Sequence, residues 1–152
     1  FKFLGTLFLI FSFYTFYEIS IAHLWIFVLL VCVSTDIGGY VFGKLFKGPR
    51  LTKISPNKTI SGVIGSFIFS IIPLIIFLKL DYLNLELDLN YVFFNLTVSL
   101  VSQLGDLLVS FFKRKAKIKD TGKILPGHGG ILDRVDGIIF AIPFSYFLLK
   151  LF

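Results

Sequence analysis

Five long apolar runs constrain this chain more than any other feature. They are windows of about 15 to 21 residues, close to the ~20 that a helix needs to cross a bilayer. The runs are Phe3–Tyr17, Leu24–Phe42, Ile60–Leu78, Tyr91–Phe112 and Ile131–Leu151. None alternates apolar and polar residues as a strand would, and backbone groups in lipid must be satisfied within the segment. The sequence therefore predicts an all-α, polytopic transmembrane helical bundle with about five spans.

Composition supports an integral membrane protein. Hydrophobic residues make up 56% of the 152 residues and charged residues only 16%, and the mean hydropathy is +0.89. A soluble domain needs more polar surface than this. We expect residues 1–152 to form a single membrane-embedded catalytic domain. Because the chain has no methionine, even at position 1, we also expect it to be a fragment that lacks N-terminal spans.

Basic residues gather in two of the connecting segments. One segment carries Lys44, Lys47, Arg50, Lys53 and Lys58, and the other carries Lys113, Arg114, Lys115, Lys117, Lys119 and Lys123. An excess of Lys and Arg marks the cytoplasmic side, so both segments are predicted to be cytoplasmic. Topogenic signalling and attraction to anionic headgroups explain the sign of this charge. They leave unexplained the glycines, histidine and carboxylates among the lysines.

Four acidic residues are predicted at a similar depth near the cytoplasmic face. They are Asp36, Asp106, Asp133 and Asp136. Unpaired carboxylates in a membrane cost a few kcal/mol each, so a group of them requires a cation. With Ser102 and Gln103 nearby these are hard oxygen donors, which favour Mg²⁺ over zinc. The alternative is that the acids form plain ion pairs with Lys58 or Arg134.

Two polar segments flank the predicted spans. In the first, Ser55-Pro56 is typical of a turn, and Thr59 or Ser61 could cap the following helix beside Lys58. Free N–H groups and a lysine at a helix start make an anion site, although an ordinary cap with a topogenic lysine is an equal alternative. In the second, Pro126–Gly130, the glycines allow the backbone to approach a phosphate or base closely.

The segment 110–136 resembles the signature of the phosphatidate cytidylyltransferases, also called CDP-diacylglycerol synthases. The matching positions are Ser110, Lys113, Arg114, Lys119, Asp120, Gly122, Pro126, His128, Gly129, Gly130, Asp133, Arg134 and Asp136. The stretches Asp36–Gly43, Ser55–Thr59 and Gln103–Asp106 resemble the same family in the same order. The resemblance covers the chain from about the second span to its end.

The resemblance implies a polytopic enzyme that condenses CTP with phosphatidic acid at the bilayer, giving CDP-diacylglycerol and pyrophosphate. It implies Mg²⁺ and a second, monovalent cation such as K⁺, a bacterial inner membrane with the site facing the cytoplasm, and no nucleic-acid partner. The oligomeric state stays open, with a homodimer among the alternatives.

The resemblance also implies roles for individual residues. Asp106, Asp133 and Asp136 would be metal ligands or their close supports and, with Lys58, catalytic; Asp36 would line the same cavity. Residues expected to contact substrate are Asp36, Ser55, Asn57, Lys113, Arg114, Lys119, Asp120, His128, Gly129, Gly130 and Arg134.

Two positions depart from the family pattern. Ile37 replaces a small hydroxyl residue, and Ser61 stands where relatives often have Glu.

Two other functions compete with this one. One rival is a CTP-dependent kinase of a membrane alcohol, which would release CDP. The other is a cation transporter that uses the intramembrane acids as an ion path. Neither rival accounts for the long match over 110–136.

Overall fold

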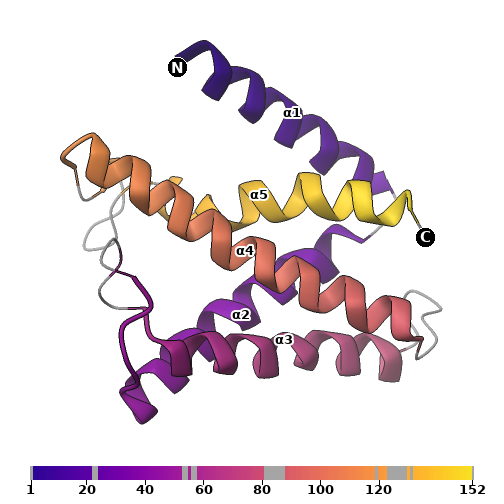
Figure 1. Cartoon of the computed structure of the whole chain (residues 1–152). Helices are drawn as coiled ribbons and strands as arrows, with labels where there is room; N and C mark the ends of the chain where they lie inside the picture. The colour runs from indigo at the N-terminus through magenta and orange to yellow at the C-terminus, as the bar shows by residue number, and fades with distance from the viewer. Residues whose placement is uncertain are drawn as a thin grey trace.

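Five helices form the described part of the chain (Figure 1). The computed structural model describes residues 2–21, 24–52, 55, 58–80, 88–118, 120–122, 130 and 132–151. The helices are α1 (Lys2–Ile21), α2 (Trp25–Phe46), α3 (Ile60–Leu80), α4 (Leu89–Lys115) and α5 (Leu132–Leu149). No strand occurs among these residues, and an isolated antiparallel bridge joins Arg50 to Thr59. The predicted all-α bundle is confirmed.

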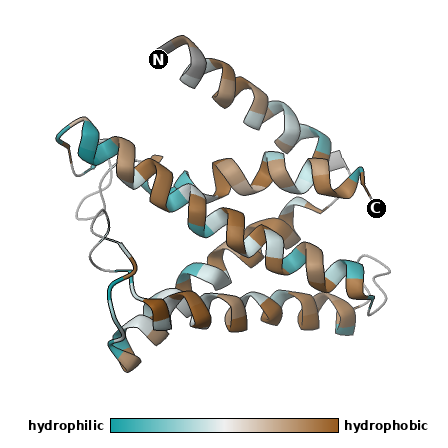
Figure 2. Ribbon diagram, in the orientation of Figure 1, coloured by the Kyte–Doolittle hydropathy of each residue, from teal (hydrophilic) through white to brown (hydrophobic). Residues whose placement is uncertain are grey.

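The helices coincide with the predicted apolar runs but several are longer. Helix α2 continues past the predicted end to Phe46, and α4 continues to Lys115, so its last turn is basic. Helices α2, α3 and α4 are each long and apolar enough to cross a membrane. Hydrophobic residues line most of the helix lengths, and hydrophilic ones gather at the end of α4 (Figure 2). The protein is therefore a polytopic integral membrane protein.

The hydrophobic core lies between α2, α3 and α4. Phe27 of α2 packs edge-on against Phe77 of α3 and stacks on Phe94 of α4, and all three are buried. Helix α5 joins this core through Ala141, whereas α1 contacts chiefly α5. The core holds α2, α3 and α4 together, and their polar ends lie on one side of it.

Glycines bring the backbones of α2 and α3 into contact at that polar end. A Cβ atom on Gly62 would lie 2.8 Å from the Gly39 carbonyl oxygen, and one on Gly65 would lie 2.7 Å from that of Gly38. Small residues at helix interfaces permit such close approach in membranes. The contact therefore fixes the separation between α2, which bears Asp36, and α3, which begins just after Lys58.

We expect Gly65→Ala to destabilise the bundle, because the added methyl group would strike the α2 backbone and Phe42. Overpacking of this kind costs about 1–3 kcal/mol. Gly5→Ala is the matched control, since no described atom lies within 4 Å of its Cβ position. Thermal unfolding of the detergent-solubilised protein measures both effects. Equal melting temperatures for the two variants would contradict the proposed backbone contact.

Candidate functional site

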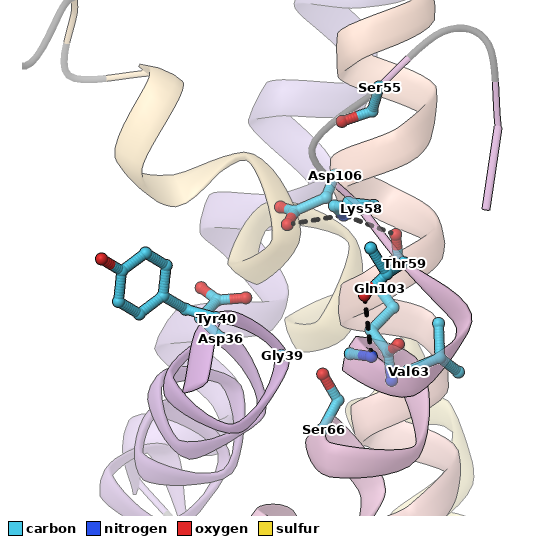
Figure 3. Close-up of a pocket in the computed structure, with 11 residues that line it drawn as sticks. Asp36, Gly39, Tyr40, Ser55, Lys58, Thr59, Val63, Ser66, Gln103 and Asp106 are labelled. Atoms are coloured by element: carbon cyan, nitrogen blue, oxygen red, sulfur yellow. Dashed lines mark hydrogen bonds and ion pairs between the residues drawn. The ribbon is translucent and has the colours of Figure 1, made fainter. Parts of the chain in front are cut away.

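A polar cavity of about 320 Å³ opens between α2, α3 and α4 (Figure 3). The residues that line it are Asp36, Gly39, Tyr40, Ser55, Lys58, Thr59, Gly62, Val63, Ser66, Gln103 and Asp106. They come from three helices and from the segment that joins α2 to α3. Asp36, Ser55, Lys58 and Asp106, which the sequence predicts as site residues, thus share one cavity.

Lys58 and Asp106 form the ion pair of this cavity. The Lys58 Nζ atom lies 3.0 Å from Asp106 Oδ2 and 3.5 Å from the Gln103 carbonyl oxygen (Figure 3). Their side chains are 29% and 20% exposed. Water therefore screens the pair only in part, and removal of either charge would leave the other incompletely solvated.

The backbone around Lys58 holds its side chain toward α4. The Leu51 N–H donates to the Lys58 carbonyl oxygen at 2.8 Å, and the Ile60 N–H donates to the Pro49 carbonyl oxygen at 3.0 Å. Thr59 then accepts a hydrogen bond from the Gly62 N–H at 3.1 Å, as a helix N-cap does. The predicted cap of the third helix is thus confirmed at Thr59.

Thr35 connects the three helices that surround the cavity. Its carbonyl oxygen accepts a hydrogen bond from the Ser66 hydroxyl at 2.8 Å, and its own hydroxyl lies 2.9 Å from that of Ser99. All three side chains are buried. Buried polar groups that satisfy one another specify one arrangement of helices, so Thr35 fixes the position of the neighbouring Asp36. The sequence does not point to this group, because isolated hydroxyl residues in apolar helices carry little signal.

Asp136 of α5 lies next to Asp106 of α4. The two carboxyl groups are close enough to interact electrostatically. Gly137 permits this approach, since a Cβ atom there would lie 2.7 Å from Ser102 Oγ and 2.9 Å from Asp106 Oδ1. The structure thus brings together two of the three predicted metal ligands, from different helices.

Asp133 lies beside this pair but has other partners. Lys113 at the end of α4 contacts Asp133 Oδ1 at 2.9 Å and Asp136 Oδ2 at 3.5 Å. Asp133 Oδ2 accepts hydrogen bonds from the Thr121 N–H at 2.8 Å, the Thr121 hydroxyl at 3.0 Å and the Gly130 N–H at 2.8 Å. Thr121 occupies a variable position of the motif, so the motif offers no reason to select it.

The donor chemistry fits a hard divalent cation at Asp106 and Asp136. Two carboxylates this close repel each other unless a proton or a cation lies with them, and oxygen ligands suit Mg²⁺. In the described part of the chain, no group of three or more His, Cys, Asp or Glu side chains is arranged to hold a metal. The predicted set of three aspartates is therefore not assembled as one cluster, and its role as a Mg²⁺ site stays a prediction.

The remaining predicted residues divide into two groups. Arg114 donates to the Ile118 carbonyl oxygen at 3.2 Å at the exposed end of α4, Asp120 is exposed, and Arg134 lies in the first turn of α5. None of these three lines the cavity. Asn57, Lys119, His128 and Gly129 lie outside the described residues.

Comparison with known proteins yields one consistent result. Residues 1–152 match the profile of the Cytidylyltransferase family. Proteins named phosphatidate cytidylyltransferase are similar to this chain: the one from Staphylococcus saprophyticus is 45% identical over 129 residues, and the one from Bacillus subtilis is 44% identical over 133 residues. These alignments cover 84% and 83% of this chain, and 49% and 48% of the relatives. The chain thus spans about half the length of the curated relatives it matches.

A double-mutant cycle tests the Lys58–Asp106 pair. We expect Lys58→Met and Asp106→Asn each to lower the free energy of unfolding, and the double variant to lose less than their sum. The coupling should be about 1–2 kcal/mol, because each single change leaves a half-buried charge unpaired. Lys79→Met, an exposed position at the far end of α3, is the control. Additivity within about 0.5 kcal/mol would show that the pair contributes nothing.

Proposed function

The chain belongs to the Cytidylyltransferase family, and we propose that it transfers the cytidylyl group of CTP to phosphatidic acid, giving CDP-diacylglycerol and pyrophosphate. One observation carries the proposal. Asp36, Lys58 and Asp106 come from three separate motif stretches and line one polar cavity within an apolar bundle. A water-soluble nucleotide and a membrane lipid must meet at such a boundary between polar and apolar surroundings.

The proposed reaction requires little help from a general base. A phosphatidate oxygen, already anionic, attacks the α-phosphorus of CTP. A bond forms between them while the bond from the α-phosphorus to the bridging oxygen breaks, and pyrophosphate leaves with that electron pair. The obstacle is to bring two polyanions together, so charge neutralisation and alignment supply the catalysis.

The described residues divide this work between them. Asp106 and Asp136 would hold the divalent cation, whose bound charge would neutralise phosphate oxygens. Lys58, 3.0 Å from Asp106, would orient that carboxylate and present its own ammonium group to a phosphate. Asp36 lies near both and adds a further negative charge to the cation side of the cavity. The second, monovalent cation is proposed on the family resemblance alone.

The site would face the cytoplasm of a bacterial cell membrane. The basic end of α4, the segment that carries Lys58 and the start of α5 lie at one end of the bundle (Figure 1). The excess of Lys and Arg supports a cytoplasmic position for that end. CTP would then arrive from the cytosol and the lipid from the surrounding leaflet.

The observed contacts weigh against one of the two rivals, the cation transporter. A cation transporter would use Asp36 and Asp106 as a path, yet Lys58 occupies the space between the helices and pairs with Asp106. A CTP-dependent kinase would share much of this geometry and differ in the phosphorus attacked. Analysis of the products separates it, because a kinase releases CDP and the proposed enzyme releases pyrophosphate.

We expect the natural full-length protein to release pyrophosphate only when CTP, phosphatidate and Mg²⁺ are all present. Asp136→Asn should lower turnover by roughly three orders of magnitude, about 4 kcal/mol of transition-state stabilisation, because it removes the charge that would hold the cation. Asp88→Asn, at the opposite end of α4, is the control and should keep normal turnover. Near-normal turnover of Asp136→Asn at saturating CTP and Mg²⁺ would make that carboxylate structural.

Cysteine labelling tests the proposed orientation. Lys44→Cys in α2 and Lys115→Cys in α4 should react with a membrane-impermeant maleimide only from the cytoplasmic side. Lys79→Cys, at the other end of α3, should react only from the opposite side. The expectation follows from the segregation of Lys and Arg. Labelling of Lys44→Cys and Lys115→Cys from opposite faces would overturn the shared site.

A further inference from the structure

The Asp133 carboxylate accepts hydrogen bonds from four donors of its own chain. Its Oδ2 accepts from the Thr121 N–H, the Thr121 hydroxyl and the Gly130 N–H at 2.8, 3.0 and 2.8 Å. Its Oδ1 contacts Lys113 Nζ at 2.9 Å. Each carboxylate oxygen offers about two lone-pair positions, so Oδ2 is fully occupied by its three donors and Oδ1 is engaged by Lys113. The side chain is 8% exposed.

These hydrogen bonds join three separate parts of the chain. Thr121 follows α4, Gly130 precedes α5, and Lys113 lies in the last turn of α4. The first two also touch directly, since a Cβ atom on Gly130 would lie 2.6 Å from Thr121 Oγ1 and 2.9 Å from the Gly122 nitrogen. Only glycine permits that approach. We call this arrangement, Asp133 with Thr121, Gly130 and Lys113, the Asp133 clasp.

Asp136 differs from Asp133 although both belong to the same motif and the same helix turn. Among the described residues it accepts the Gly137 N–H at 3.1 Å, and Lys113 is more distant, at 3.5 Å. The adjoining Gly137 packs against Asp106, since a Cβ atom there would lie 2.9 Å from Asp106 Oδ1, so Asp136 is next to the second predicted ligand. The two acids therefore have separate tasks in this structure.

We propose that Asp133 is a positioning residue and not a metal ligand. Building on the proposed function, it acts by holding Thr121 and Gly130 together at the start of α5 and by holding the Lys113 charge next to Asp136. Lys113 is likewise engaged by carboxylates rather than presented to the nucleotide. Loss of Asp133 should therefore loosen the segment ends while leaving the affinity for a divalent cation unchanged.

Two measurements on the detergent-solubilised, natural full-length protein separate a clasp from a metal ligand. The first is Mn²⁺ binding, followed by electron paramagnetic resonance, with Mn²⁺ as the probe for the divalent site. Asp133→Asn should bind Mn²⁺ within about threefold of wild type, whereas Asp136→Asn should bind it at least about tenfold more weakly. The second is amide hydrogen exchange at Thr121 and Gly130, which should be about tenfold faster in Asp133→Asn than in wild type.

Gly130→Ala and Thr121→Val provide matched variants that leave every carboxylate in place. Both should accelerate the same amide exchange without changing Mn²⁺ affinity, and Thr121→Val should have the smaller effect because it removes only the hydroxyl donor. If Asp133→Asn folds poorly, these two variants still decide the question.

Either of two results would overturn the clasp. One is Mn²⁺ binding that weakens as much in Asp133→Asn as in Asp136→Asn; the other is amide exchange that stays at the wild-type rate in all three clasp variants. Neither measurement depends on transfer activity. If wild-type protein released no pyrophosphate, the proposed function alone would be refuted. If wild-type protein bound no Mn²⁺, the metal assignment would be refuted. In either case amide hydrogen exchange would still decide the clasp.

Discussion

The pairing of carboxylates with lysines at the polar end of an apolar bundle is the constraint on which the rest of the structure depends. A charge removed from water costs several kcal/mol unless a partner of opposite sign meets it. Lys58 meets Asp106 at 3.0 Å, and Lys113 meets Asp133 and Asp136 at 2.9 and 3.5 Å. Lys58 lies in the segment before α3, so its pair ties that segment to α4. Lys113 lies in the last turn of α4, so its pairs tie α4 to the start of α5.

The surrounding packing makes those pairs possible. Gly38 and Gly65 allow α2 and α3 to touch along their backbones, and Gly137 allows the start of α5 to reach Asp106. The buried hydroxyl groups of Thr35, Ser66 and Ser99 then fix α4 against the other two helices. Each of these residues is small, because large side chains at these positions would hold the helices too far apart for the site residues to meet.

Much of this arrangement could be predicted from the sequence, and the reason for each gap is physical. The lengths of the apolar runs alone located the five helices. The four acidic residues were expected at one depth in the membrane because an excess of Lys and Arg marks the cytoplasmic ends of the helices. Sequence motifs identified Asp133 and Asp136 as equivalent, however, since residues three apart share a helix face. Their partners differ because Gly130, three residues earlier, and Thr121, twelve residues earlier, both donate to Asp133. The contact from Thr121 leaves no trace in local spacing.

The packing of the helices is uneven. Helix α2 packs on α3 far more extensively than on any other helix, whereas α4 divides its packing about equally between α5 and the α2–α3 pair. The α2–α3 pair, with its backbones in contact at glycines, is therefore the most tightly packed unit of the bundle. Lys58 precedes α3 and Asp106 lies in α4, so their ion pair joins that unit to α4. A motion that moved α4 away from the α2–α3 pair would separate this lysine from this aspartate, so the ion pair opposes widening of the cavity between them.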